Sequence, residues 1–247
     1  MPHLLVAHPG HELLLHGWIA RTKPVVHVLT DGSAHGLTPR LGRTTELLHD
    51  LGARPGAIFG RLTDGEAYAM ILECNAALLL TLVLELAEPL ERERPELVVV
   101  DAVEGYNPVH DLCRLIAGAA IGMAGIDTKL YEYAVVDDPR SAGAALVVEL
   151  DDAEYAEKMS CARNEAATLS DIDALLASHG PDAYRRETLC PVDDWTADAG
   201  DAPPRYERLG EARVAAGRYA RVIRRTEHML PLRDALLAAV EKRTCAF

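Results

Sequence analysis

Short apolar runs, separated by segments long enough for helices, limit the folds that this chain can form. The runs fall at His3–Val6, Pro24–Thr30, Ala57–Leu62, Leu97–Val100 and Lys129–Val136. The run Leu97–Val100 reads LVVV, which is typical of a strand buried on both faces of a sheet. Strands that alternate with helices imply βαβ units with right-handed crossovers. The sequence therefore predicts an α/β fold with a mostly parallel sheet flanked by helices.

The segments between these runs carry the apolar periodicity of helices. Helices are expected at Leu13–Ala20, Arg43–Leu51, Tyr68–Glu93, His110–Met123 and Pro231–Lys242. A sixth strand, antiparallel or at a sheet edge, is expected at Ala145–Leu150, and a capping box at Asp151 and Glu154 opens a helix that runs to about Ser178. Residues 181–204 are expected to be rich in loops, and the pattern of residues 207–225 is ambiguous. We interpret residues 1–247 as a single domain in which residues 181–247 form a loop-rich and helical C-terminal extension.

Charge and cysteine content argue against several classes of protein. The formal net charge of the 247 residues is −13, which disfavours binding to nucleic acid or to an anionic membrane, because both require a basic face. The longest apolar stretch, Ala76–Leu84, is too short to span a membrane. The five cysteines include no C-x-x-C pair, and the N-terminus lacks a secretory leader pattern. We therefore expect a cytoplasmic protein with reduced thiols that acts on a small molecule.

The turn after the first strand carries two histidines. Residues 7–12 read AHPGHE, so His8 and His11 are three positions apart, a spacing that places side chains on one face of a helix. In open α/β sheets, ligands bind just outside the carboxyl ends of the strands. His8 and His11 are therefore candidate metal ligands, although an H-x-x-H spacing also occurs without a metal.

A third histidine follows the fourth strand. His110 stands at the start of a predicted helix, and the first and fourth strands of such a sheet are commonly neighbours at its switch point. This topology brings His110 next to His8 and His11. Three histidines with one open position are typical of a catalytic zinc site. The alternative is that His110 is an ordinary polar residue in the first turn of its helix.

Four motifs occur in order along the chain. They are AHPGHE at residues 7–12, TDG at 30–32, RTTE at 43–46 with LG at 51–52, and EGYNPVH at 104–110. They resemble the AHPDDE, TDG, RxxE with LG, and EGGHPDH signatures of the LmbE/PIG-L family of zinc-dependent N-acetylglucosaminyl deacetylases. The resemblance covers roughly residues 3–190. It implies a Rossmann-like sheet, one zinc or other divalent metal ion per chain and hydrolysis of an N-acetylglucosaminyl compound or related amide, and it leaves a homo-oligomer open.

The resemblance also implies which residues bind the metal. The ligand positions are His8, His11 and His110, and His11 stands where the family has an aspartate. The position of the family's general base is Gly10, which cannot accept a proton. A histidine thought to assist catalysis is replaced by Asn107, which can donate a hydrogen bond to an oxyanion but cannot deliver a proton. The metal ligands are therefore retained in the motifs, whereas the acid–base pair is lost.

Four carboxylates are candidates for the missing base. Asp31 is the first candidate, as a base or as a residue that orients a ligand, and a plain turn residue is the alternative. Glu12 is another, although it also suits the dipole at a helix N-terminus. Glu104 and Asp111 follow the fourth strand.

Three residues are candidates for substrate binding: Arg43, Glu104 and Tyr106. Arg43 and Glu46 lie one helical turn apart, so a surface ion pair is the alternative for Arg43. Cys113 lies three residues after His110, and we interpret it as a small core residue rather than as a fourth metal ligand.

These residues lead to three hypotheses. The first is a metal-dependent amide hydrolase, a deacetylase acting on an N-acylated sugar-like or small metabolite, in which metal-bound hydroxide attacks the carbonyl and Asn107 helps to stabilise the oxyanion. The second is a non-hydrolytic three-histidine enzyme with iron or cobalt on the same scaffold, since imidazole also suits those metals. The third is a catalytically silent relative that binds a metabolite.

Overall fold

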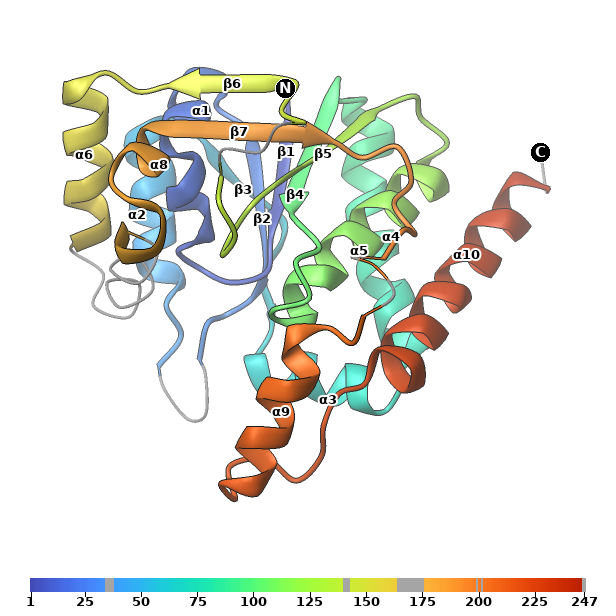
Figure 1. Cartoon of the computed structure of the whole chain (residues 1–247). Coiled ribbons are helices and arrows are strands. Elements are labelled where there is room, and N and C mark those ends of the chain that lie inside the picture. The colour runs from blue at the N-terminus through green and yellow to red at the C-terminus, as the bar shows by residue number, and fades with distance from the viewer. Residues whose placement is uncertain (34–37, 140–142, 164–175, 199, 201, 246–247) are drawn as a thin grey trace.

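A seven-stranded sheet forms the centre of the protein in a computed structural model that describes residues 1–33, 38–139, 143–163, 176–198, 200 and 202–245 (Figure 1). The strand order is β3-β2-β1-β4-β5-β7-β6. The parallel strands are β1 (His3–Val6), β2 (Val25–Thr30), β3 (Arg54–Leu62), β4 (Leu97–Asp101) and β5 (Lys129–Tyr133). Antiparallel pairing adds β7 (Arg186–Pro191) to β5 and the edge strand β6 (Leu146–Glu149) to β7. The predicted mostly parallel α/β sheet is confirmed, as is the antiparallel edge strand.

The switch point of the sheet lies at β1. This strand pairs in parallel with β2 on one side and with β4 on the other, and Leu5 lies opposite Val100 in the β1–β4 register. Every residue of β1 and β2 is buried, as their continuous apolar sequences predict. The predicted neighbourhood of the first and fourth strands is confirmed, so the segments that follow β1 and β4 leave the sheet side by side.

Helices cover both faces of the sheet (Figure 1). One face packs against α1 (His16–Thr22) and α2 (Leu41–Leu51), through Ile19 and Leu48 among others. The other face packs against α4 (Ala76–Glu93) and α5 (Pro108–Ala124), and α10 (Leu230–Thr244) packs on the outer side of these two helices. The shorter elements are the 3-10 helix η1 (His11–Leu15), α3 (Asp64–Leu72), α6 (Asp152–Arg163), α8 (Asp182–Arg185), α9 (Arg205–Ala215) and the π-helix η2 (Arg225–Met229).

The C-terminal segment shares the core of the second face. Leu232 and Leu236 of α10 belong to the same buried cluster as Leu112 of α5. Tyr206 of α9 and Ile223 belong to that cluster as well. The segment that follows α9 is therefore held against the body of the protein by apolar contacts. Among the described residues, no helix has both the length and the apolar character needed to cross a membrane.

The single helix predicted at Tyr68–Glu93 is wrong, because α3 and α4 are two helices. Between them, Cys74 has a φ of +47°, in the left-handed region that cannot continue a right-handed helix. The side chain of Asn75 then accepts the N–H of Leu78 at 3.0 Å and caps α4. A local cap thus outweighs an apolar stripe that runs through both helices.

The predicted loop at residues 181–204 is wrong where it contains β7. The sequence of this strand, RETLCP, has no apolar run, and the strand is formed by pairing with β5 and β6 on its two sides. The ambiguous segment 207–225 contains most of α9. The helix predicted from Asp151 to Ser178 is observed as α6, and residues 164–175 of that prediction lie outside the described residues.

Candidate metal centre and adjoining cavity

Three imidazole rings meet beyond the ends of β1 and β4. His8 lies in the turn after β1, His11 begins η1, and His110 lies in the first turn of α5. The ring centroids of His8 and His11 are 5.3 Å apart, those of His8 and His110 are 5.3 Å apart, and those of His11 and His110 are 4.6 Å apart. The structure therefore brings together the three histidines of the sequence motifs, which we call the cavity cluster.

A glycine turn, rather than a shared helical face, brings His8 next to His11. Gly10 has a φ of +103°, a conformation that residues with a side chain rarely adopt. Its N–H donates to Glu12 Oε2 at 2.8 Å, which fixes the turn. A carboxylate residue at position 10 would strain this backbone, so the conformation of the turn favours glycine.

Hydrogen bonds orient the ring of His8. Its Nδ1 lies 2.8 Å from Thr30 Oγ1 and 3.1 Å from Asp64 Oδ1. The Thr30 hydroxyl donates to the carbonyl of Ala7 at 3.1 Å, so it accepts from His8, and the proton of this ring is on Nδ1. The lone pair on Nε2 then accepts from Asn107 Nδ2 at 3.2 Å. Burial lowers the pKa of His8, which favours the neutral ring.

A fully buried carboxylate holds the ring of His11. Asp101, the last residue of β4, accepts from His11 Nδ1 at 2.7 Å. It also accepts from the Ala7 N–H at 2.9 Å and from the Tyr133 hydroxyl at 2.7 Å. Burial lowers the pKa of His11, but the charge and hydrogen bond of Asp101 outweigh it and raise this pKa overall. Because Nδ1 donates to Asp101, Nε2 is the atom of His11 that is left for a ligand.

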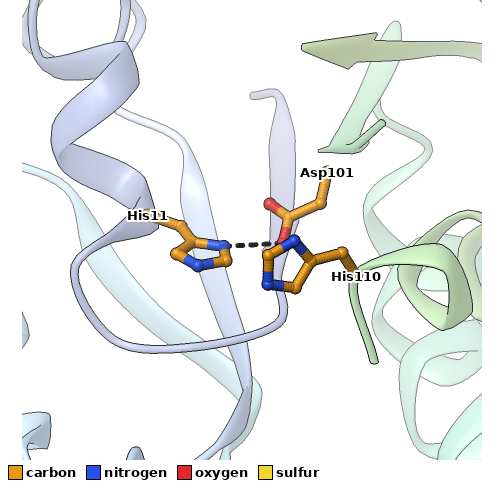
Figure 2. Close-up of side chains that lie close together, drawn as sticks. All are labelled: His11, Asp101 and His110. Carbon is orange, nitrogen blue, oxygen red and sulfur yellow. Dashed lines mark hydrogen bonds and ion pairs between the residues drawn. The ribbon is translucent and has the colours of Figure 1, made fainter. Parts of the chain in front are cut away.

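His110 contributes a nitrogen without a partner. The residue is 4% exposed, and among the described residues nothing hydrogen-bonds to its buried Nδ1. Burial lowers the pKa of His110 well below its ordinary value, and His11 and His8 act in the same direction. Figure 2 shows the ring beside His11 and Asp101, and ligand atoms of these three side chains lie within 4.8 Å of one another. Such an orphaned nitrogen, beside a second imidazole and a carboxylate, fits a bound cation.

The cavity cluster lines a cavity of about 860 Å³, a size that suits a small molecule. The lining includes all three histidines, whereas Asp101 lies outside it. A molecule in this cavity can therefore contact the rings of His8, His11 and His110 directly. Asp101 contacts His11 through a hydrogen bond from outside the lining.

Two further sequence candidates lie at the cavity. Asn107 caps α5 by accepting the N–H of Val109 at 3.0 Å, and it accepts the Tyr68 hydroxyl at 3.3 Å. These two bonds occupy Oδ1 and leave the amide nitrogen directed at His8. Tyr106 also lines the cavity, with its ring centroid 6.4 Å from that of His110.

Three candidates lie outside the cavity lining. Glu12 is 1% exposed and accepts from the Thr44 hydroxyl at 2.7 Å, so it links the turn before η1 to α2. Asp31 accepts a backbone N–H two residues further on at 2.9 Å, in a turn. Arg43 is exposed and pairs with Glu46 at 2.7 Å, which is the surface ion pair given above as its alternative.

Glu104, Asp111 and Cys113 also lie outside this lining. Glu104 accepts the backbone N–H groups of residues 135, 136 and 137 at 3.1, 3.0 and 2.7 Å and so anchors the segment after β5. Asp111 accepts the Gly105 N–H at 3.2 Å, and burial raises the pKa of its carboxyl to about 7. Cys113 is fully buried in the core.

The sequence reasoning missed Asp64 and Asp101. Asp101 is the one charged residue of β4, at its carboxyl end, where ligand-binding groups of parallel sheets gather. This position is a sequence signal for Asp101, but the predicted strand Leu97–Val100 ends one residue before it. Asp64 follows Thr63, which forms a capping box with Glu66, so the start of α3 could have been placed at the carboxyl end of β3.

Comparisons with known proteins identify the fold. Solved structures that share it include the A40926 pseudoaglycone deacetylase Dbv21, which is 19% identical over 80% of this chain and 98% of its own, with a TM-score of 0.57. The conserved protein TT1542 from Thermus thermophilus is 19% identical over 77% of this chain and 93% of its own, with a TM-score of 0.52. A deacetylase of the teicoplanin biosynthesis pathway is 13% identical over 78% of this chain and 100% of its own, with a TM-score of 0.51. No protein-family model and no curated protein sequence matches the chain.

Proposed function

We propose that the chain is a metal-dependent amide hydrolase of the deacetylase type, acting on an N-acylated sugar-like or other small compound. The observation that carries the proposal is the cavity cluster, in which three imidazoles converge on a cavity of small-molecule size. Two of the solved structures with the same fold are deacetylases by name, and this supports removal of an acyl group as the reaction.

The residues of the cavity cluster fit a divalent metal ion. A metal requires neutral imidazoles, and burial favours the neutral form of both His8 and His110. The unpartnered Nδ1 of His110 gives the group a polar atom that a cation would satisfy. Zinc is commonly held by three histidines in catalytic sites, so we assign one zinc ion per chain, with another divalent transition metal as the alternative.

We assign the ligands to His8, His11 and His110. In this assignment Asp101 is a positioning residue that orients the ring of His11, as carboxylates commonly do for metal-binding histidines. A rival set replaces His8 by Asp101. We prefer His8 because it lines the cavity, whereas Asp101 lies outside the lining and already accepts three hydrogen bonds.

A divalent metal supplies Lewis-acid polarisation of a carbonyl and lowers the pKa of water. The chain itself supplies a donor for the carbonyl oxygen: Asn107 Nδ2, beside His8, can donate to the negative charge that develops when an amide carbonyl is attacked. Burial raises the pKa of Tyr68 to about 12, so its hydroxyl stays protonated and holds Oδ1 of Asn107. Asp31 and Glu12 have no place in this mechanism, because neither residue lines the cavity and their carboxylates accept hydrogen bonds from the protein.

A second candidate function is non-hydrolytic chemistry with iron or cobalt at the same histidines. It is favoured by Gly10, which has no carboxylate at the position where the resembling family has its base. The φ of +103° at this position disfavours a residue with a side chain. Among the described residues, the carboxylates that line the cavity are Asp64 and Glu73, and Asp64 is bonded to Nδ1 of His8. General base catalysis is worth about 10²–10⁴-fold, so its loss would matter to a hydrolase.

Release of a primary amine from N-acetylglucosamine and from a panel of N-acylated amines tests the proposal. We expect release by the zinc-loaded protein, none after chelation, and none by a His11→Ala variant. His49→Ala is the matched control, because the His49 side chain is 89% exposed and lies outside the cavity lining, and it should leave release unchanged. Bound iron or cobalt without amide cleavage would favour the second candidate, and cleavage that persists in His11→Ala would overturn the site.

A further inference from the structure

Three arginines from the C-terminal segment line the cavity of the cavity cluster. Arg213 lies in α9, and Arg218 and Arg221 follow it in the chain. Figure 1 shows α9 beside α3, below the ends of the strands. We call Arg213, Arg218 and Arg221 the arginine wall. These arginines belong to none of the four motifs, and the proposed mechanism does not use them.

The ion pairs of the described residues do not include the arginine wall. Within the described part of the chain, no carboxylate forms an ion pair with any of the three arginines. The contrast is with Arg224, a few residues further on, which pairs with Glu207 at 3.1 Å and with Glu211 at 2.7 Å. The acidic residues of this segment thus hold a neighbouring arginine and leave the arginine wall available to a ligand.

Contacts connect Arg213 to the cavity cluster. Its guanidinium donates to the Tyr219 hydroxyl at 3.3 Å and lies over the Tyr219 ring, 5.3 Å from the centroid. The ring centroids of Tyr219 and Tyr68 are 6.0 Å apart. Tyr68 in turn donates to Asn107, which donates to His8. One substrate could therefore reach both Arg213 and the histidines.

The rest of the lining does not cancel this charge. Among the described residues, the acidic members of the lining are Asp64, which hydrogen-bonds to His8, and Glu73. Lys158 also lines the cavity, but its ammonium group pairs with Glu187 at 2.8 Å and is buried. Arg40 lines it too and adds a further positive charge. A cavity lined with excess positive charge in a chain of net charge −13 indicates a site that attracts an anion locally.

We propose that the arginine wall binds an anionic group of the substrate, a carboxylate or a phosphate, so that the substrate is an acidic N-acyl compound. Arginine suits both groups, because its planar guanidinium can donate two parallel hydrogen bonds to their oxygens. The inference rests on the proposed function for the reaction at the other end of the substrate. Binding of an anionic group by the arginine wall can be measured whether or not the amide is cleaved.

Binding by calorimetry tests this claim with three glycosides of N-acetylglucosamine: the neutral propyl glycoside, the glycoside of 3-hydroxypropanoic acid, and the 1-phosphate. Each is titrated into chelated and zinc-loaded protein, and amine release is recorded separately. We expect at least one acidic probe to bind about 10-fold or more tightly than the neutral one, as charge-assisted hydrogen bonds allow. The stronger of the two acidic probes identifies the anion as carboxylate or phosphate.

Variants show whether the arginine wall causes the preference. The triple variant Arg213→Gln, Arg218→Gln, Arg221→Gln should bind all three probes with similar affinity while keeping its melting temperature. Arg208→Gln is the matched control, because Arg208 is an exposed arginine of α9 outside the lining, and it should keep the preference. Equal binding of neutral and acidic probes by the wild type, or a preference that survives in the triple variant, would overturn the inference. Absence of amine release with the preference intact would overturn only the proposed reaction.

Discussion

Strand β1 separates two groups of histidines whose surroundings differ. Beyond its carboxyl end lies the cavity cluster of His8, His11 and His110. At its start, His3 Nδ1 lies 3.1 Å from His27 Nε2, and His3 Nε2 lies 3.2 Å from Glu93 Oε2. The N–H of Ile58 donates to His27 Nδ1 at 3.3 Å, so each ring in this histidine relay, as we call His3 and His27, has a donor or acceptor for both nitrogens.

The hydrogen bonding of the two groups separates histidines that stabilise the fold from those that we propose as metal ligands. Both relay rings are fully buried, and their hydrogen bonds run in one direction from Ile58 to Glu93. The cavity cluster is also buried, but His110 Nδ1 has no partner among the described residues and the rings line a cavity. Burial is common to both groups. Incomplete hydrogen bonding at a cavity is what distinguishes the cavity cluster.

Among changes that leave all three histidines of the cavity cluster in place, removing the amide of Asn107 should have the largest effect, because this amide is the donor that we propose for the oxyanion. Asn107→Ser keeps an oxygen that can cap α5 but removes the nitrogen that reaches His8. On whichever N-acyl probe is cleaved, kcat should fall about 10²–10³-fold, as for loss of an oxyanion donor. Steady-state kinetics beside a melting curve checks this. A kcat within a few-fold of wild type at an unchanged melting temperature would contradict the assigned role.

Acid should destabilise the protein partly by protonating the histidine relay. Burial lowers the pKa of His27 to about 3, from an ordinary value of 6.5. The unfolded chain therefore binds the proton first, so stability is full above pH 6.5 and declines as the pH falls from 6.5 towards 3. The loss is about 1.4 kcal/mol per pH unit, or roughly 2.7 kcal/mol at pH 4.5.

A His27→Gln variant should lack this part of the acid sensitivity, since glutamine is neutral throughout. Urea unfolding of chelated wild type and variant at pH 7 and pH 4.5 measures the difference. His49→Gln, at an exposed position, is the control and should follow the wild type. Parallel pH profiles for wild type and His27→Gln would show that His27 is not buried in its neutral form.

Crowding the relay should lower stability by a smaller amount. A Cβ at Gly56 would lie 2.4 Å from two atoms of the His27 ring, so Gly56→Ala should destabilise by roughly 1–3 kcal/mol through overpacking. Gly42→Ala provides the control, because Gly42 lies in α2 with open space around a Cβ and alanine favours helix. Metal content should be unchanged in both variants. A Gly56→Ala protein as stable as wild type would mean that the relay is loosely packed.

The sheet could be predicted because the sequences of β1, β2 and β4 are apolar enough to indicate buried strands. The topology of parallel sheets predicts that β1 and β4 are neighbours, and this neighbourhood brings His110 next to His8 and His11. β7 could not be found in the same way, because RETLCP has no apolar run and the pairing partners of this strand lie far away in the sequence.

The site could be predicted less completely than the sheet. Motif residues lead to the three histidines and to Asn107, but not to the side chains that hold them. Asp101 holds His11 only because β4 and β1 are neighbours, and Asp64 reaches His8 only because α3 starts beside the end of β2. Conversely, Asp31 and Glu12 belong to the motifs, but their carboxylates stabilise local turns and do not line the cavity.

Metal content tests the central claim most directly, because the rival ligand sets differ in one residue. The proteins are purified without added metal or affinity tag and analysed for metal per chain: wild type, His8→Ala and Asp101→Asn. We predict about one zinc per chain in the wild type and none in His8→Ala. Asp101→Asn should still bind zinc when titrated, with affinity lowered about 10–100-fold, as for loss of an orienting residue. Full metal content in His8→Ala, with none in Asp101→Asn, would contradict the account and assign the metal to His11, Asp101 and His110.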